Sequence, residues 1–82
     1  MSRSVHDRVI KVMAQRLIRE NDEIHLNETF SWHGMDSIDE IDVLMAIEHE
    51  FNHDIPDDVI QRICTPGDVI KYFEGINETA AV

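Results

Sequence analysis

Apolar residues recur at helical spacing near the start of the chain. Between residues 4 and 20 they fall on one broad helix face, which comprises Val5, Val9, Val12, Met13 and Leu17. Ser4 is a suitable N-cap for this helix, and Asp7 follows three residues later as in a capping box. The pattern predicts a first amphipathic helix.

Residues 21–36 are mostly polar, and their apolar residues show no regular period. This composition predicts a long loop, pinned to the core by its scattered apolar side chains, which are Ile24, Leu26, Phe30 and Trp32. Long loops in small domains are often functional.

Helical spacing returns at residues 37–52, which give the strongest helix pattern of the chain. One side of that helix is an ordinary core face, formed by Val43, Leu44, Ile47 and Phe51. Pro56 breaks the pattern, and a short third helix is expected to end near Ile63.

A last helix is expected after Thr65, which is a suitable N-cap. Pro66 suits the first helical position, and Asp68 completes a box-like pair with Thr65. We expect this helix to stop near Gly75 and the tail, residues 76–82, to be frayed.

The predicted fold is therefore all-α: a small four-helix bundle with a long loop between the first two helices and a short third helix. Neither a pair of strands nor an internal repeat is evident. Residues 1–82 are expected to form a single domain with an ordered core at about 4–75.

The charge of the chain restricts its partners. The formal net charge is −10, which argues against binding to nucleic acid or to anionic membranes. From Glu20 to Asp58 there are thirteen acidic residues and no Lys or Arg. This run favours partners with basic patches, and divalent cations such as magnesium are expected to stabilise the fold by relieving repulsion.

Cellular location is suggested by two features. The single cysteine, Cys64, cannot form an internal disulfide. The first residues lack the apolar run of a signal peptide, and no stretch approaches transmembrane length. We expect a cytoplasmic monomer that does not insert into a membrane.

The helix at residues 37–52 carries a second apolar stripe, nearly opposite its core face. The stripe consists of Ile38, Ile41 and Met45, accompanied by Asp42, Glu48 and His49, with Asp39 at its edge. Either this helix is buried on both sides, or the stripe is an exposed docking site. If both faces of the helix were buried, the acids beside the stripe would be buried without partners. The pattern therefore favours docking of a basic partner.

Ser37 stands where this helix begins. Ser37 and Glu40 fit the capping-box pattern, although Asp36 could be the N-cap instead. A catalytic nucleophile would need a neighbouring base; His33 is near in sequence, but the G-x-S-x-G pattern is absent. A hydroxyl at a helix start also suits a phosphodiester, because the backbone N–H groups there favour an anion. Spacing alone does not select that role.

Residues 34–58, which read GMDSIDEIDVLMAIEHEFNHDIPDD, closely resemble the acyl carrier protein family. The matching features are Asp36-Ser37-Ile38 after Gly34, the acidic-apolar helix ending at Glu50-Phe51, and Ile55-Pro56-Asp57; a weaker resemblance extends over residues 5–75. His33 and His49 depart from the family pattern, which usually has an aliphatic residue and an acid there. A dedicated polyketide or specialised lipid pathway is therefore considered beside fatty acid synthesis.

The resemblance implies a non-catalytic substrate carrier. Ser37, in the motif with Asp36, would be esterified by 4'-phosphopantetheine from coenzyme A, installed by a magnesium-dependent phosphopantetheinyl transferase. The arm would carry acyl groups as thioesters to biosynthetic enzymes. Those enzymes would place basic patches on the second helix, at Ile38, Asp39, Ile41, Asp42, Met45 and Glu48.

Other classes of function stay open from the sequence. An aminoacyl or peptidyl carrier would share the attachment motif, and an unmodified interaction module would share the fold. Residues 49–53 also match the H-E-x-x-H pattern of zinc peptidases, with His49 and His53 as ligands. That reading lacks a downstream histidine as third ligand, and we expect no metal site in the chain.

Overall fold

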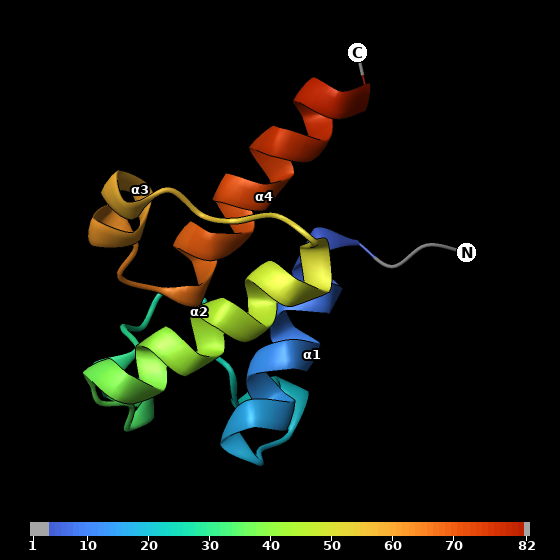
Figure 1. The fold of residues 1–82 in the computed structure, drawn as a ribbon. Coiled ribbons are helices and arrows are strands. Elements are labelled where there is room, and N and C mark those ends of the chain that lie inside the picture. The colour runs from blue at the N-terminus through green and yellow to red at the C-terminus, as the bar shows by residue number, and fades with distance from the viewer. Residues whose placement is uncertain (1–3, 82) are drawn as a thin grey trace.

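The computed structural model describes residues 4–81, and the side chains of residues 4–76. It contains α1 (Val5–Leu17), η1 (Asn21–Glu23), η2 (Ser31–His33), α2 (Ser37–Phe51), α3 (Asp57–Arg62) and α4 (Pro66–Ala81). Residues 4–81 include four α-helices and no strand (Figure 1). The predicted all-α bundle, with its long first loop and short third helix, is confirmed.

The core lies where α1 packs against both α2 and α4. Its most deeply buried side chains come from all three helices and the long loop, and include Val9, Met13, Phe30, Val43, Ile47, Val69 and Phe73. At the edge of this core, Phe51 of α2 stacks on Phe73 of α4 with ring centroids 4.3 Å apart. The core face predicted for the second helix is therefore the one that the fold uses.

Both ends of α1 are closed by hydrogen bonds. The Ser4 hydroxyl accepts from the Asp7 backbone N–H at 3.1 Å, as predicted for the N-cap. At the other end Ile18 takes a left-handed conformation, with φ of 55°. The Arg19 backbone N–H then donates to the Ala14 carbonyl at 2.9 Å, which completes a Schellman-type ending. This turn fixes where the backbone of Arg19 lies.

The long loop is held to the core by side chains and by backbone hydrogen bonds. Ile24 and Phe30 are buried, as predicted, and Leu26 packs partly against the core. The Leu26 carbonyl accepts from the Gly67 N–H at 3.0 Å. A β-carbon at Gly67 would lie only 2.9 Å from that carbonyl oxygen, so this contact requires glycine.

The prediction that Trp32 anchors the loop to the core is wrong. Trp32 is 55% exposed, whereas the neighbouring His33 is 1% exposed and takes the buried position. The three-residue turn η2 places these adjacent side chains in different directions, and the buried ring is the one whose polar atoms find partners in the loop.

The start of α4 is capped as predicted. The Thr65 hydroxyl accepts from the Asp68 N–H at 3.1 Å, and the Asp68 carboxylate accepts from the backbone N–H groups of Cys64 and Thr65. These hydrogen bonds, that from Cys64 foremost, lower the pKa of Asp68 despite a smaller opposing effect of burial.

The expected end of this helix near Gly75 is wrong, because α4 continues to Ala81. The positive-φ residues among 4–81 are Ile18, Gly34 and Asn52, so Gly75 does not make the left-handed turn that ends a helix. A glycine inside a helix costs about 1 kcal/mol relative to alanine, which weakens the helix without stopping it. Of the tail expected to fray, Val82 and the side chains of residues 77–81 lie outside the described residues.

Candidate functional site

The N-terminus of α2 is capped one residue earlier than the Ser37–Glu40 box predicts. Asp36 is the N-cap: its carboxylate accepts from the Asp39 N–H at 2.9 Å. The Asp39 carboxylate in turn accepts from the Asp36 N–H at 3.1 Å, which completes a capping box. The prediction that Ser37 caps the helix is therefore wrong, and the alternative N-cap, Asp36, is correct.

This shift in the cap leaves Ser37 as the first helical residue, with an exposed side chain. Its hydroxyl makes no hydrogen bond with the described residues, since the Glu40 N–H that a serine cap would have used donates to the Asp36 carbonyl at 3.0 Å. The backbone N–H groups of Ser37 and Ile38 also lack an acceptor within residues 4–81. The helix start therefore offers a free hydroxyl beside two free donors, a setting that accommodates a phosphate ester.

The chain reaches this helix through a tight turn. Gly34 has φ of 85°, and its N–H donates to the Ser31 carbonyl at 2.9 Å. Met35 is buried, and its N–H donates to the Phe30 carbonyl at 3.2 Å. Because Met35 is anchored in the core, Asp36 and Ser37 emerge at the surface in a fixed position.

The buried His33 ring holds the loop just before this turn. Its Nε2 accepts from the His25 backbone N–H at 3.0 Å, and its Nδ1 lies 2.7 Å from the Thr29 carbonyl oxygen. A ring nitrogen that accepts carries no proton, so the ring is neutral and Nδ1–H donates to Thr29. His33 is thus held in its buried position by hydrogen bonds of both ring nitrogens to the loop backbone.

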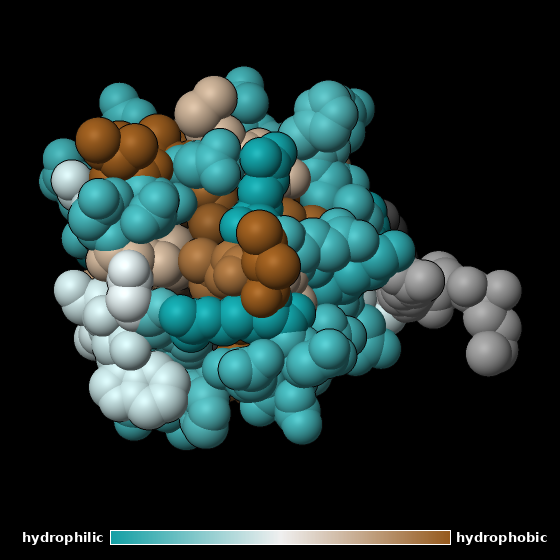
Figure 2. Space-filling model, turned by 90° about the horizontal axis from the view of Figure 1, so that it is seen from below, coloured by the Kyte–Doolittle hydropathy of each residue, from teal (hydrophilic) through white to brown (hydrophobic). Residues whose placement is uncertain are grey.

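The second apolar stripe of α2 faces solvent. Ile38 is 74% exposed, Ile41 58% and Met45 61%. Burial of α2 on both sides is therefore wrong within this chain. Figure 2 shows the molecule from below relative to Figure 1, and on this face apolar groups are surrounded by hydrophilic ones.

The acids that accompany this stripe differ in what they bind. Asp39 belongs to the capping box and stays exposed. Asp42 is exposed and lies 3.6 Å from Arg16 of α1. Glu48 is partly buried, and its carboxylate accepts from the Ile55 N–H at 2.6 Å. Each of the three carboxylates thus has one oxygen in an intramolecular contact, but Asp39 and Asp42 are exposed, whereas Glu48 is partly buried and holds the turn after α2.

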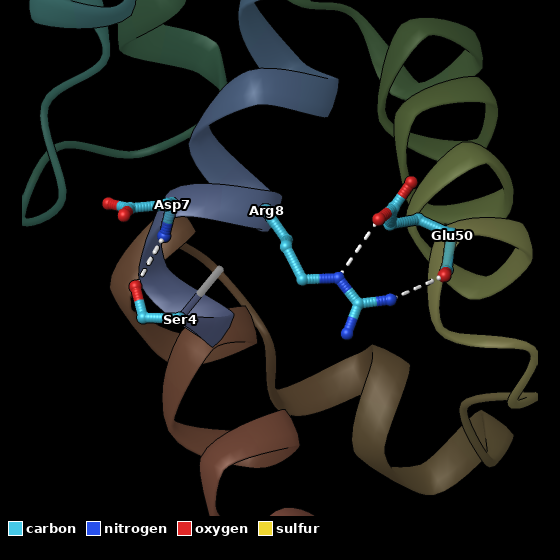
Figure 3. Close-up of polar contacts among 4 residues, drawn as sticks. All are labelled: Ser4, Asp7, Arg8 and Glu50. Atoms are coloured by element: carbon cyan, nitrogen blue, oxygen red, sulfur yellow. Dashed lines mark hydrogen bonds and ion pairs between the residues drawn. The ribbon is translucent and has the colours of Figure 1, made fainter. Parts of the chain in front are cut away.

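The H-E-x-x-H pattern does not form a metal site. Arg8 binds Glu50 twice: Nε donates to the carboxylate at 2.9 Å and Nη2 to the backbone carbonyl at 2.8 Å (Figure 3). His53 Nε2 lies 2.9 Å from the Tyr72 hydroxyl, and His49 is exposed. No group of three or more His, Cys, Asp or Glu side chains that could hold a metal is present among the described residues.

Among residues 4–81, no helix combines the length and the apolar character needed to cross a bilayer.

Residues 7–73 match the family described as "Phosphopantetheine attachment site". The match spans most of the chain and includes all of α2 and its cap. The chain therefore belongs to this family of carrier proteins.

Membership in this family defines what kind of protein the chain is. It is a non-catalytic carrier, and its prosthetic group is 4'-phosphopantetheine. Carriers of this kind are modified by phosphopantetheinyl transferases and interact with the enzymes that process their cargo. The family assignment to non-catalytic carriers replaces the zinc hydrolase reading of the sequence, and Glu50 is paired with Arg8.

Proposed function

We propose that this carrier is an acyl carrier protein whose phosphopantetheine arm is attached to Ser37. The observation that carries the proposal is the state of this side chain: an exposed hydroxyl, at the first position of α2, that makes no hydrogen bond with the described residues. Asp36 supports the same assignment, because by capping the helix it leaves the Ser37 hydroxyl free to be esterified.

The partner surface would begin at the next residue. Ile38, Ile41 and Met45 would supply apolar contact area, while Asp39 and Asp42 would attract and orient a basic patch. Glu48 would contribute through its charge, although one of its oxygens is already bound by Ile55 N–H. A transferase docked here would have the Ser37 hydroxyl within its reach.

The cargo is proposed to be an acyl group, delivered in a fatty acid, polyketide or specialised lipid pathway. Support comes from the acidic second helix, which suits the basic docking patches of acyl-processing enzymes. An aminoacyl or peptidyl carrier is the second candidate, since it would use the same arm.

The attachment site can be tested by intact mass. The chain is incubated with coenzyme A, magnesium and a broad-specificity phosphopantetheinyl transferase. We expect wild type and Ser31→Ala to gain one phosphopantetheine group and Ser37→Ala to gain none. Ser31 is the matched control because it is an exposed serine in the loop that leads to α2. An unmodified wild type, under conditions that load another carrier, would contradict the proposal and leave the chain as an interaction module.

The class of cargo needs a second assay on the loaded protein. An acyl-transferring enzyme and an amino-acid-activating enzyme are each offered the same loaded carrier, and thioester formation is followed by mass. We expect acylation at the higher rate. Preferential aminoacylation would instead assign the chain to peptide synthesis.

A further inference from the structure

One arginine lies beside the turn that leads to Ser37. Arg19 follows α1, and a β-carbon built at Gly34 would lie 3.5 Å from its Nη2 atom. Gly34 is three residues before Ser37. The fold therefore brings a cation to the start of an acidic helix, although none of residues 20–58 is Lys or Arg.

The register of the two helices supports the same placement. Arg8 binds Glu50, and Arg16 lies 3.6 Å from Asp42. From Arg8 to Arg16 the chain advances eight residues along α1, while their partners go back eight residues along α2, from Glu50 to Asp42. The two helices therefore run antiparallel. The C-terminal end of α1 therefore lies near the first half of α2, and Arg19 follows that end directly.

Arg8 and Arg16 of α1 are both paired with acids, but Arg19 is not paired within the described residues. Arg8 is bound to Glu50 and Arg16 to Asp42, whereas the exposed Arg19 guanidinium forms no ion pair or side-chain hydrogen bond within residues 4–76. The backbone of Arg19 is fixed by its hydrogen bond to Ala14, so the unpaired side chain starts from a defined point.

A phosphodiester on Ser37 would meet an unfavourable charge environment. Asp36 and Asp39 flank Ser37, and both are exposed carboxylates of the capping box. The free N–H groups of Ser37 and Ile38 would offset part of the added negative charge. A guanidinium can offset more, because it is always charged and binds phosphate through a fork of N–H donors.

We propose that Arg19 is the counter-charge for the phosphodiester that joins the arm to Ser37. This inference rests on the proposed function, since it requires the arm at that serine. Arg19 binds and orients the phosphate without taking part in a covalent step. The class of ligand that it recognises is a phosphodiester held between the end of α1 and the start of α2.

The test compares Arg19→Gln with Lys11→Gln, which removes one charge from the exposed side of α1, the helix that Arg19 follows. Lys11 is an exposed residue in the middle of α1, eight residues before Arg19, so it is a control for general charge effects. All variants are first loaded to completion and checked by intact mass. A wild type that cannot be loaded contradicts the proposed function, and with it this inference.

On the loaded proteins, two signals report the contact. The Arg19 Nε–H resonance should shift when wild type is loaded, and the phosphorus-31 signal of the phosphodiester should move in Arg19→Gln but stay in place in Lys11→Gln. The kcat/KM of loading should also fall about twofold to fivefold in Arg19→Gln, the range expected for one exposed charge pair.

The outcomes separate this inference from the proposal on which it rests. Complete loading with an unmoved Arg19 resonance and an unchanged phosphorus signal would overturn the role of Arg19 and leave Ser37 as the attachment site. An equal effect of Lys11→Gln would overturn it as well, because a general change of charge would then account for the result.

Discussion

At the scale of single residues, the site depends on which side chain caps α2. Asp36 is the cap and accepts a hydrogen bond from the Asp39 N–H, so the next residue, Ser37, does not cap the helix. The sequence limited the choice to Asp36 or Ser37 but could not decide it, because both residue types are good N-caps. The chain entering α2 decides, since Met35 is anchored in the core and Asp36 is the next residue.

His33 was identified from the sequence as a departure from the family pattern, but its structural role was not predicted. Periodicity detects apolar side chains, whereas His33 is buried because its two ring nitrogens bind His25 and Thr29. The same limitation explains why Trp32 was wrongly expected to pin the loop. Arg19 escaped notice because only the packing of α1 against α2 brings it to Gly34.

The hydrogen bonds of His33 give a stability prediction. His33→Leu introduces an apolar side chain of similar size but removes the ring nitrogens that bind the His25 N–H and the Thr29 carbonyl. The Thr29 carbonyl then keeps only the longer bond from the backbone N–H of residue 33, at 3.4 Å. We expect the free energy of unfolding to fall by about 1–3 kcal/mol in urea denaturation. His49→Leu, at an exposed position of α2, should change it by less than about 0.5 kcal/mol. Equal stability of the two variants would contradict this role of His33.

At the scale of elements, α2 has two apolar faces with different tasks. Val43, Leu44 and Ile47 are buried in the bundle, while Ile38, Ile41 and Met45 remain exposed. Helical periodicity separated these faces from sequence alone, because a helix in a small bundle needs only one core face. The ends of elements were harder to predict: α4 passes through Gly75, since a glycine alone does not impose a left-handed turn.

The two faces can be separated by substituting one isoleucine on each. Ile47 is completely buried, so Ile47→Ala should lower the free energy of unfolding by about 2–5 kcal/mol. Ile41→Ala should leave it within about 0.5 kcal/mol but weaken binding of the transferase by about 1–2 kcal/mol, measured as a rise in the dissociation constant.

Either of two results would count against the docking face. Ile41→Ala could destabilise the fold as much as Ile47→Ala, which would place Ile41 in the core. Alternatively, transferase binding could be unchanged in Ile41→Ala while the protein stays folded, which would remove Ile41 from the partner surface.

At the scale of the whole molecule, the charge is distributed unevenly. The chain has seventeen acidic and seven basic residues, and five of the seven basic residues precede Glu20. The packing of α1 against α2 lets Arg8 and Arg16 neutralise part of the acidic helix. The remaining acids favour basic partners and repel one another, which reduces the stability of the isolated protein.

Magnesium should relieve this repulsion through diffuse binding, because no metal-binding group is formed by the described residues. We expect the midpoint of thermal unfolding to rise when magnesium chloride replaces sodium chloride at equal ionic strength. For a domain of this size, ~1 kcal/mol corresponds to a shift of about 4–8 °C. An unchanged midpoint at matched ionic strength would show that repulsion among these acids does not limit stability.

The central claim, that Ser37 carries the arm, is tested most directly by locating the modification within the chain. Wild type loaded with phosphopantetheine is digested, and each serine-containing peptide is sequenced by tandem mass spectrometry. We expect the added mass on Ser37 alone, with Ser2, Ser4 and Ser31 unmodified. Phosphopantetheine on any other residue, or a fully loaded chain with an unmodified Ser37, would contradict the account.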